Sequence, residues 1–122
     1  MGDLSKDFSV SELCCPCAKC NSNGVVPHKR LLDLLQAVRD DLGHAIRVTS
    51  GIRCRDHNEA VGGEDLSRHL PEFGDAVDIA CGDSYLRRRL VDALLRHGAT
   101  AVKLYPKHVH ADCRPGAPLF IV

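Results

Sequence analysis

Two segments with helical periodicity set the first constraint on the fold. The first runs from Pro27 to Gly43, and its apolar positions are Leu31, Leu34, Leu35, Val38 and Leu42. The second is capped by Asp83 or Ser84 and closed by His97-Gly98, and its apolar positions are Leu86, Leu90, Val91, Leu94 and Leu95. Because each apolar stripe must be buried against another layer, the two helices predict a sheet that they cover.

Short segments with strand character accompany these helices. They are residues 45–49, 76–80, 101–105 and 109–113, with an edge strand at 119–122. A turn at Pro106-Lys107 joins the third and fourth segments. The order of elements predicts an α+β domain in which two main helices pack on a mostly antiparallel sheet.

Length and charge restrict the classes of protein that the chain can represent. Its 122 residues suit one domain over residues 1–122, with residues 1–26 as an irregular, cysteine-containing cap. Sixteen Lys and Arg balance sixteen Asp and Glu, and there are two Tyr, three Phe and no Trp. We therefore expect no nucleic-acid partner, and we expect a monomer. No signal peptide or membrane span is predicted, so the chain as written is expected to be cytoplasmic.

Three polar side chains share one face of the strand around residues 108–112. His108, His110 and Asp112 alternate with Val109 and Ala111, so the three point the same way. On a buried face, each unpaired polar group would cost about 1–3 kcal/mol, which favours a bound ligand. The alternative is that this face is exposed to solvent.

A loop histidine and a strand carboxylate extend this set. His69 lies in a loop, and Asp78 lies between Val77 and Ile79, where a buried carboxylate requires a cationic partner. Two imidazoles and one carboxylate, with a fourth position for water, are typical of a catalytic zinc, because structural zinc sites are usually closed by four protein ligands. The sequence therefore predicts a metal site that includes His69 and Asp78.

The order of these motifs resembles the peptidase M15 family. The matching segments are FSVSEL (8–13), VTSGIRC (48–54), DHNEAVGG (56–63), SRHL (67–70), GDAVDI (74–79), and YP (105–106) followed by VHAD (109–112). The resemblance implies a zinc D-Ala-D-Ala carboxypeptidase or related peptidoglycan peptidase, on the fold shared with the zinc domain of hedgehog proteins. It also implies one catalytic zinc ion. The implied ligands are His69, Asp78 and His110, and the implied substrate-binding residues are Arg53 and Ser67. Arg53 is also expected to be catalytic, because it would neutralise negative charge on the substrate or the oxyanion.

Two departures from the family pattern leave alternatives open. The gap between His69 and Asp78 is two residues longer than usual, which makes Asp75 a competing ligand. Where many members carry the general base, three positions before the last histidine ligand, this chain has Lys107. We expect His108 to serve as the catalytic base instead, because its ordinary pKa of about 6.5 suits proton transfer. The alternative is a solvent-facing His108 without a role.

A cysteine cluster near the N-terminus suggests a second, structural metal. The clustered residues are Cys14, Cys15, Cys17 and Cys20, while the dispersed Cys54, Cys81 and Cys113 are expected to pack as small apolar residues. Cys14 or Cys15, with Cys17 and Cys20, could hold a structural zinc, and Cys54 or His57 could complete it. A disulfide is the oxidised alternative.

The metal motif and the family resemblance together imply a zinc metallopeptidase that hydrolyses an amide bond in peptidoglycan stem peptides or cross-links. It would act in the periplasm or outside the cell if phage lysis or export delivers it there. A zinc-stabilised binding domain without catalysis is the first alternative, favoured by Lys107. A cysteine-rich redox or metal-storage protein is the second. Carboxypeptidases and endopeptidases differ in the shape of the substrate groove. In this chain, the loops within residues 58–73 are expected to set that shape.

Overall fold

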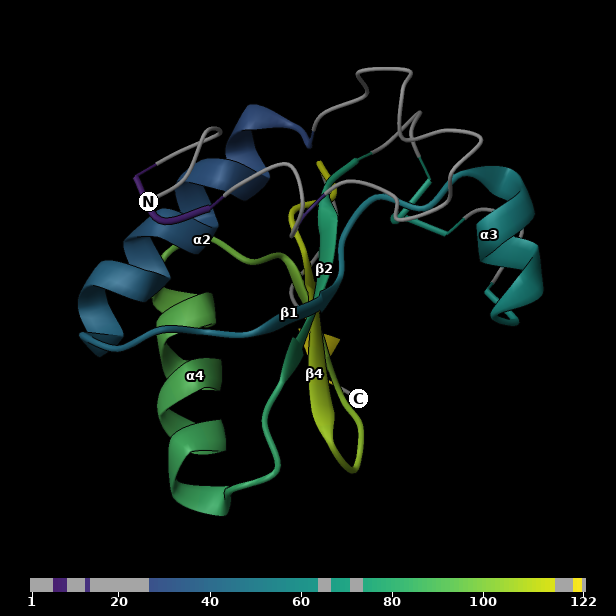
Figure 1. The fold of residues 1–122 in the computed structure, drawn as a ribbon. Helices are drawn as coiled ribbons and strands as arrows, with labels where there is room; N and C mark the ends of the chain where they lie inside the picture. The colour runs from purple at the N-terminus through teal and green to yellow at the C-terminus, as the bar shows by residue number, and fades with distance from the viewer. Residues whose placement is uncertain are drawn as a thin grey trace.

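The two main helices and the strands follow one another in the order that the sequence predicts. The computed structural model describes residues 6–8, 13, 27–63, 67–70, 74–115 and 120–121. The elements are α2 (Lys29–Leu42), β1 (Val48–Ser50), α3 (Arg55–Ala60), β2 (Ala76–Ala80), α4 (Ser84–Arg96), β3 (Ala101–Leu104), β4 (His108–Asp112) and β5 (Phe120–Ile121). Figure 1 shows α2 and α4 on one side of the sheet and α3 on the other. The α+β class is confirmed.

Helix α2 begins and ends at the residues that local chemistry selects. The Nδ1 atom of His28 accepts a hydrogen bond from the backbone N–H of Arg30 at 3.1 Å. Gly43 closes the helix with φ of 73°, in the left-handed region that glycine adopts without a steric penalty. All five apolar positions predicted from the sequence are buried: Leu31, Leu34, Leu35, Val38 and Leu42.

Helix α4 packs beside α2 and is capped as predicted. The Asp83 carboxylate accepts a hydrogen bond from the backbone N–H of Leu86 at 2.9 Å. Leu90, Ala93 and Leu94 are buried. The expectation that Leu86 is buried was wrong, because this side chain lies in the first turn beside an open groove and is 39% exposed.

The sheet has the strand order β1-β2-β4-β3-β5. The first four strands are antiparallel to their neighbours, and β5 runs parallel to β3. The strand expected at residues 45–49 occupies Val48–Ser50 instead, because register pairing with β2 begins only at Val48, and the register then shifts before Ser50. The strand expected at 109–113 begins one residue earlier, at His108, which pairs with Ala80.

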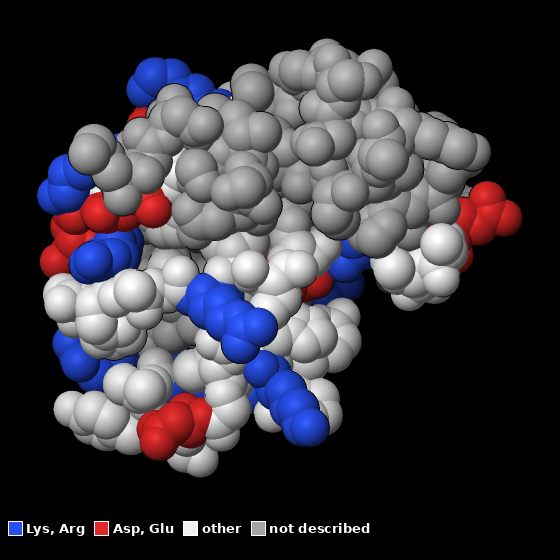
Figure 2. Space-filling view, in the orientation of Figure 1, with Lys and Arg blue, Asp and Glu red and all other residues white. Residues whose placement is uncertain are grey.

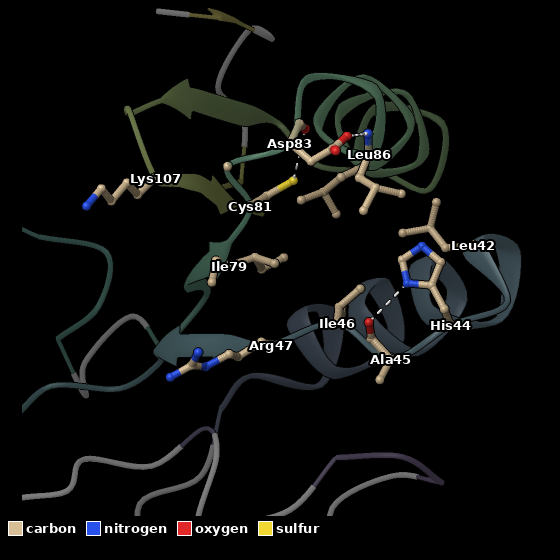
Figure 3. A pocket seen from close by; sticks show the side chains of 13 residues that line it. Leu42, His44, Ala45, Ile46, Arg47, Ile79, Cys81, Asp83, Leu86 and Lys107 are labelled. Atoms are coloured by element: carbon tan, nitrogen blue, oxygen red, sulfur yellow. Dashed lines mark hydrogen bonds between the residues drawn. The ribbon is translucent and has the colours of Figure 1, made fainter.

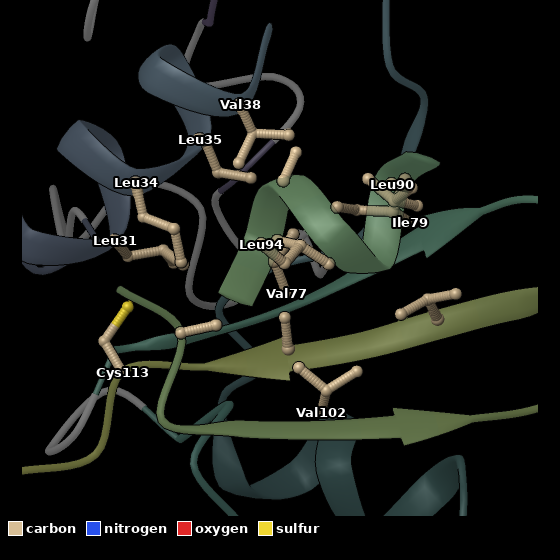
Figure 4. Close-up of a cluster of buried hydrophobic side chains, with 14 of the residues drawn as sticks. Leu31, Leu34, Leu35, Val38, Val77, Ile79, Leu90, Leu94, Val102 and Cys113 are labelled. Atoms are coloured by element: carbon tan, nitrogen blue, oxygen red, sulfur yellow. The ribbon is translucent and has the colours of Figure 1, made fainter. Parts of the chain in front are cut away.

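The two faces of the sheet differ in polarity. Apolar side chains on one face pack against α2 and α4 to form the core, as Figure 4 shows for Val77, Ile79 and Val102. Because strand residues alternate between faces, Asp78 and His110 project from the opposite face. The core thus fixes the strands while leaving the polar face for α3 and the loop at residues 67–70.

The outer surface of the helices carries charges of both signs. Figure 2 shows basic and acidic side chains interspersed over α2 and α4. Several are paired, including Lys29 with Asp33 at 2.8 Å and Arg96 with Asp41 at 2.7 Å. Among the described helices, none has the length and apolar character that crossing a bilayer requires.

Candidate metal centre

Three side chains meet on the polar face of the sheet: His69, Asp78 and His110. Their ligand atoms all lie within 4.8 Å of one another. Oδ1 of Asp78 lies 3.1 Å from Nδ1 of His110 and 3.4 Å from Nε2 of His69. The two imidazole rings contact each other edge to face, with their centroids 5.2 Å apart. This group of donors could hold a metal ion.

Each of the three side chains is held by a second contact on its other polar atom. Nδ1 of His69 donates to the backbone carbonyl of Gly51 at 2.7 Å, so in a neutral imidazole Nε2 is the nitrogen that can bind a metal ion. Nε2 of His110 lies 3.0 Å from Oδ2 of Asp112. Oδ2 of Asp78 accepts from Arg53 at 3.1 Å. Such outer contacts fix the orientation of metal-binding side chains.

Backbone pairing explains why the three converge. Asp78 on β2 is the register partner of His110 on β4, so their side chains project from the same face of adjacent strands. His69 is brought to them by the segment after β1, because the backbone N–H of Arg53 donates to the carbonyl of His69 at 2.7 Å. The Ser67 hydroxyl accepts from the backbone N–H of His69 at 3.2 Å.

Gly51 sits at a point of close approach behind this loop. A Cβ atom at this position would collide with the backbone of Leu13. The neighbouring N–H of Ile52 donates to the Leu13 carbonyl at 2.7 Å. Only glycine therefore allows the chain to pass here while its carbonyl holds His69.

The electrostatics of the group favour charged forms. Burial raises the pKa of Asp78, but hydrogen bonds from His110 and His69 outweigh burial and hold the pKa well below its ordinary value. Burial lowers the pKa of His110, but hydrogen bonds to Asp112 and Asp78 outweigh it and raise the pKa. Asp78 is therefore held in its ionised form, and the carboxylates beside His110 favour a positive charge at that position.

A cleft of about 420 Å³ opens over the three side chains. The predicted residues Arg53, Ser67 and His108 line it together with them. The imidazole of His108 stacks on the ring of Tyr105, with centroids 4.5 Å apart and planes at 9°. Arg53 is held in place by Ser50, Asn58 and Asp78, to which its guanidinium donates.

Asp75, the alternative ligand, lies in a different interaction. Its carboxylate accepts from Nε and Nη2 of Arg68, at 3.0 and 2.6 Å. This bidentate ion pair is buried on the carboxylate side and ties the loop that carries His69 to the start of β2. The geometry therefore favours Asp78 over Asp75 in the metal centre.

Sequence reasoning missed the partner that fixes Asp112. Arg114 donates from Nε and Nη2 to the two oxygens of Asp112, at 2.8 and 2.6 Å. Asp112 is fully buried and also contacts His110. The spacing of Asp112 and Arg114 by two residues was the available signal, since it places both on one side of the chain.

A second groove, of about 590 Å³, lies at the C-terminal end of β2. Figure 3 shows Arg47 and Lys107 on one side of this groove and apolar side chains, including Leu42 and Leu86, on the other. Lys107 thus lines this groove, whereas His108 lines the cleft. Of the two residues considered for the proton-transfer role, only His108 lines the cleft over the metal centre.

The three cysteines that the structure describes differ in burial. Cys113 is buried in the core, and burial raises its pKa to about 12. Cys54 and Cys81 are half-buried. Cys14, Cys15, Cys17 and Cys20 lie outside the described residues, as does the side chain of His57. The predicted structural zinc at the cluster therefore stays a prediction.

Comparison with known proteins agrees with the geometry of this site. The sequence model of the family described as Peptidase M15 matches residues 6–112, which include the three converging side chains. The chain belongs to the peptidase M15 family. A comparison with curated proteins gave no match. Membership of this family makes the chain a peptidase-family protein with a peptide as its class of substrate.

Proposed function

We propose that this M15 family member is a zinc peptidase in which His69, Asp78 and His110 hold the ion. The convergence of their three ligand atoms is the observation that carries the proposal. Zinc bonds of 2.0–2.1 Å in a tetrahedral site place ligand atoms about 3.3 Å apart. The observed separations of 3.1 and 3.4 Å at Asp78 Oδ1 agree with that value.

The donor types also suit zinc. Two neutral imidazoles and one carboxylate leave a fourth position for water or substrate, as in catalytic rather than structural sites. When bound, zinc supplies Lewis acidity that polarises a carbonyl group and lowers the pKa of water toward neutrality. The outer contacts from Gly51 and Asp112 hold both imidazoles with one nitrogen facing the common point.

The chain's own side chains would supply the remaining chemistry. His108 would accept a proton from the attacking water and return one to the leaving amine. Its stacking against Tyr105 limits the rotation of the imidazole within the cleft. The Arg53 guanidinium would bind the carboxylate of the substrate or the developing oxyanion, and its contact with Asp78 supports this role because it holds the guanidinium next to a proposed zinc ligand. Ser67 would line the same side of the cleft.

We infer that the substrate is a peptide of bacterial peptidoglycan, cleaved in its stem or its cross-links. The motif resemblance to D-Ala-D-Ala carboxypeptidases and related peptidoglycan peptidases supports this substrate class. The open cleft and the permanently charged Arg53 support recognition of a peptide with a free carboxylate.

Digestion of purified peptidoglycan tests the proposal. Mass spectrometry of the released fragments, with and without a chelator, should show zinc-dependent cleavage by the parent protein. His110→Ala should abolish both zinc binding and cleavage. His97→Ala is the matched control, because His97 lies outside the cleft and contacts Asp41. Cleavage that His110→Ala leaves at the parent level would refute the proposal.

A zinc-stabilised binding domain without catalysis is the second candidate. Lys107 favours it, because many family members carry a carboxylate at this position and lysine cannot accept a proton while charged. Turnover by the parent protein that His108→Ala abolishes would exclude this candidate. Zinc binding without turnover at any pH would support it.

A further inference from the structure

One row of residues crosses the sheet through the metal centre. Register pairs join Ser50 to Asp78, Asp78 to His110, and His110 to Lys103. Nε of Arg53 donates to the Ser50 hydroxyl at 3.0 Å, which places the guanidinium at the β1 end of this row. Lys103 lies at the β3 end.

The two cationic side chains therefore flank the candidate metal ligands. Neighbouring strands are roughly 4.8 Å apart, so the backbones of β1 and β3 are separated by roughly 14 Å. Both Arg53 and Lys103 line the cleft. Their long side chains shorten the gap between the charged groups, and an extended peptide covers roughly 3.3 Å per residue. A peptide of a few residues can therefore reach both ends.

Arg114, which follows β4, adds another cation to the lining of the cleft. Nε and Nη2 of its guanidinium are fixed on Asp112, and its side chain is 30% exposed and lines the cleft. Among the described residues that line the cleft, Arg53, Arg68, Lys103 and Arg114 are basic and Asp78 alone is acidic. The described lining is thus basic on both sides of the metal centre.

We propose that Lys103, supported by Arg114, forms a subsite for an acidic side chain of the substrate. On the other side of the ion, Arg53 binds the terminal carboxylate of the substrate. This role of Arg53 is part of the proposed function, on which the inference rests. The substrate class is then a peptide with two carboxylates that flank the scissile bond. The subsite makes the protein specific for an acidic side chain. A substrate with an amide in place of this carboxylate cannot form the charge-assisted hydrogen bond with Lys103.

Two labelled peptides provide the test: fluorescein-Ala-Glu-D-Ala-D-Ala and its counterpart with Gln in place of Glu. Both carry the same terminal carboxylate, so they differ only in the group that faces Lys103. The zinc-loaded parent protein should show kcat/KM about tenfold higher for the Glu peptide, since a hydrogen bond to a charged group contributes that order of selectivity. Lys103→Gln should reduce the preference below about twofold, and Lys103→Arg should keep it.

Equilibrium binding gives a readout that does not depend on turnover. Fluorescence anisotropy with zinc-loaded His108→Ala protein should show the same preference for the Glu peptide, and adding Lys103→Gln should remove it. Lys107→Gln is the matched control, because it deletes the same charge beside the other groove and should keep the preference. Thermal unfolding of each variant checks that it is folded.

The outcomes separate the two proposals. Cleavage of both peptides at equal rates, with equal binding, would overturn the subsite and leave the peptidase function standing. A Glu preference in binding that depends on Lys103, without cleavage of either peptide or of peptidoglycan, would support the subsite and overturn the peptidase function. A preference that Lys107→Gln removes as fully as Lys103→Gln would also overturn the subsite, because it would reflect the general charge of the protein.

Discussion

Replacement of Asp112 by Asn tests whether the carboxylate behind His110 controls metal affinity. Asp112 is fully buried, and its Oδ2 contacts both His110 Nε2 at 3.0 Å and Arg114 Nη2 at 2.6 Å. Asn has the same shape, but its amide nitrogen would place a donor where two donors already point. Loss of such an outer contact weakens metal binding by about 10–100-fold, or about 1.4–2.7 kcal/mol.

Two measurements should record this loss. A competition titration with a chromophoric chelator gives the zinc affinity directly. Zinc at about 100 times the parent Kd should raise the parent's free energy of unfolding by about 2.7 kcal/mol, and that of Asp112→Asn by only about 0.4–1.4 kcal/mol. The metal-free variant should itself lose about 3 kcal/mol, the lower end for a broken buried ion pair, because Arg114 is partly exposed.

Asp75→Asn is a control that also removes a buried charge but leaves the contact that orients the ligand His110 intact. The Asp75 side chain is 6% exposed and paired with Arg68 in the same bidentate manner. This variant should lose comparable stability yet keep zinc affinity within about threefold, because its carboxylate holds Arg68 rather than a ligand. The reasoning is refuted if Asp112→Asn binds zinc like the parent, or if Asp75→Asn loses as much affinity.

Three further predictions concern packing and protonation. Gly51→Ala should cost about 1–3 kcal/mol, because its Cβ would collide with the backbone of Leu13; a melting temperature equal to the parent's would contradict this. Burial lowers the pKa of His110, but two carboxylates outweigh it and raise the pKa, so zinc affinity should fall as pH drops from about 8 to 6; a flat profile would count against the site. In the metal-free protein, charged His110 stabilises the fold below about pH 6.5. This contribution to the free energy of unfolding is lost as the pH rises through the raised pKa of His110 in the folded state. With a pKa of about 12, Cys113 should be alkylated at pH 8 about a thousandfold more slowly than in the unfolded chain, and peptide mapping that finds equal rates would disprove its burial.

The helices were predictable because their signals are local. The apolar stripe of α2, its closure at Gly43 and the Asp83 cap of α4 each depend on residues within one or two turns. The start of β1 at Val48 was not predictable, because the end of a strand depends on where the neighbouring strand offers backbone N–H and C=O groups for hydrogen bonds. Leu86 was misplaced because periodicity does not show where a neighbouring layer stops.

The parts of the candidate site that depend on strand alternation and on motif order were predictable from the sequence. Alternation placed His110 and Asp112 on one face, and the motif order brought His69 and Asp78 to the same region. The contact of Asp112 with His110 agrees with their place on one face of the same strand. The partners fixed by the tertiary fold did not follow: Arg68 on Asp75, and the carbonyl of Gly51 on His69. Those contacts join segments that approach each other only after the sheet has formed.

Anomalous diffraction at the zinc absorption edge, on crystals of the zinc-loaded protein, tests the central claim most directly. The account predicts a peak within bonding distance of His69 Nε2, Asp78 Oδ1 and His110 Nδ1 together. Zinc found elsewhere, with no peak among these three atoms, would contradict it.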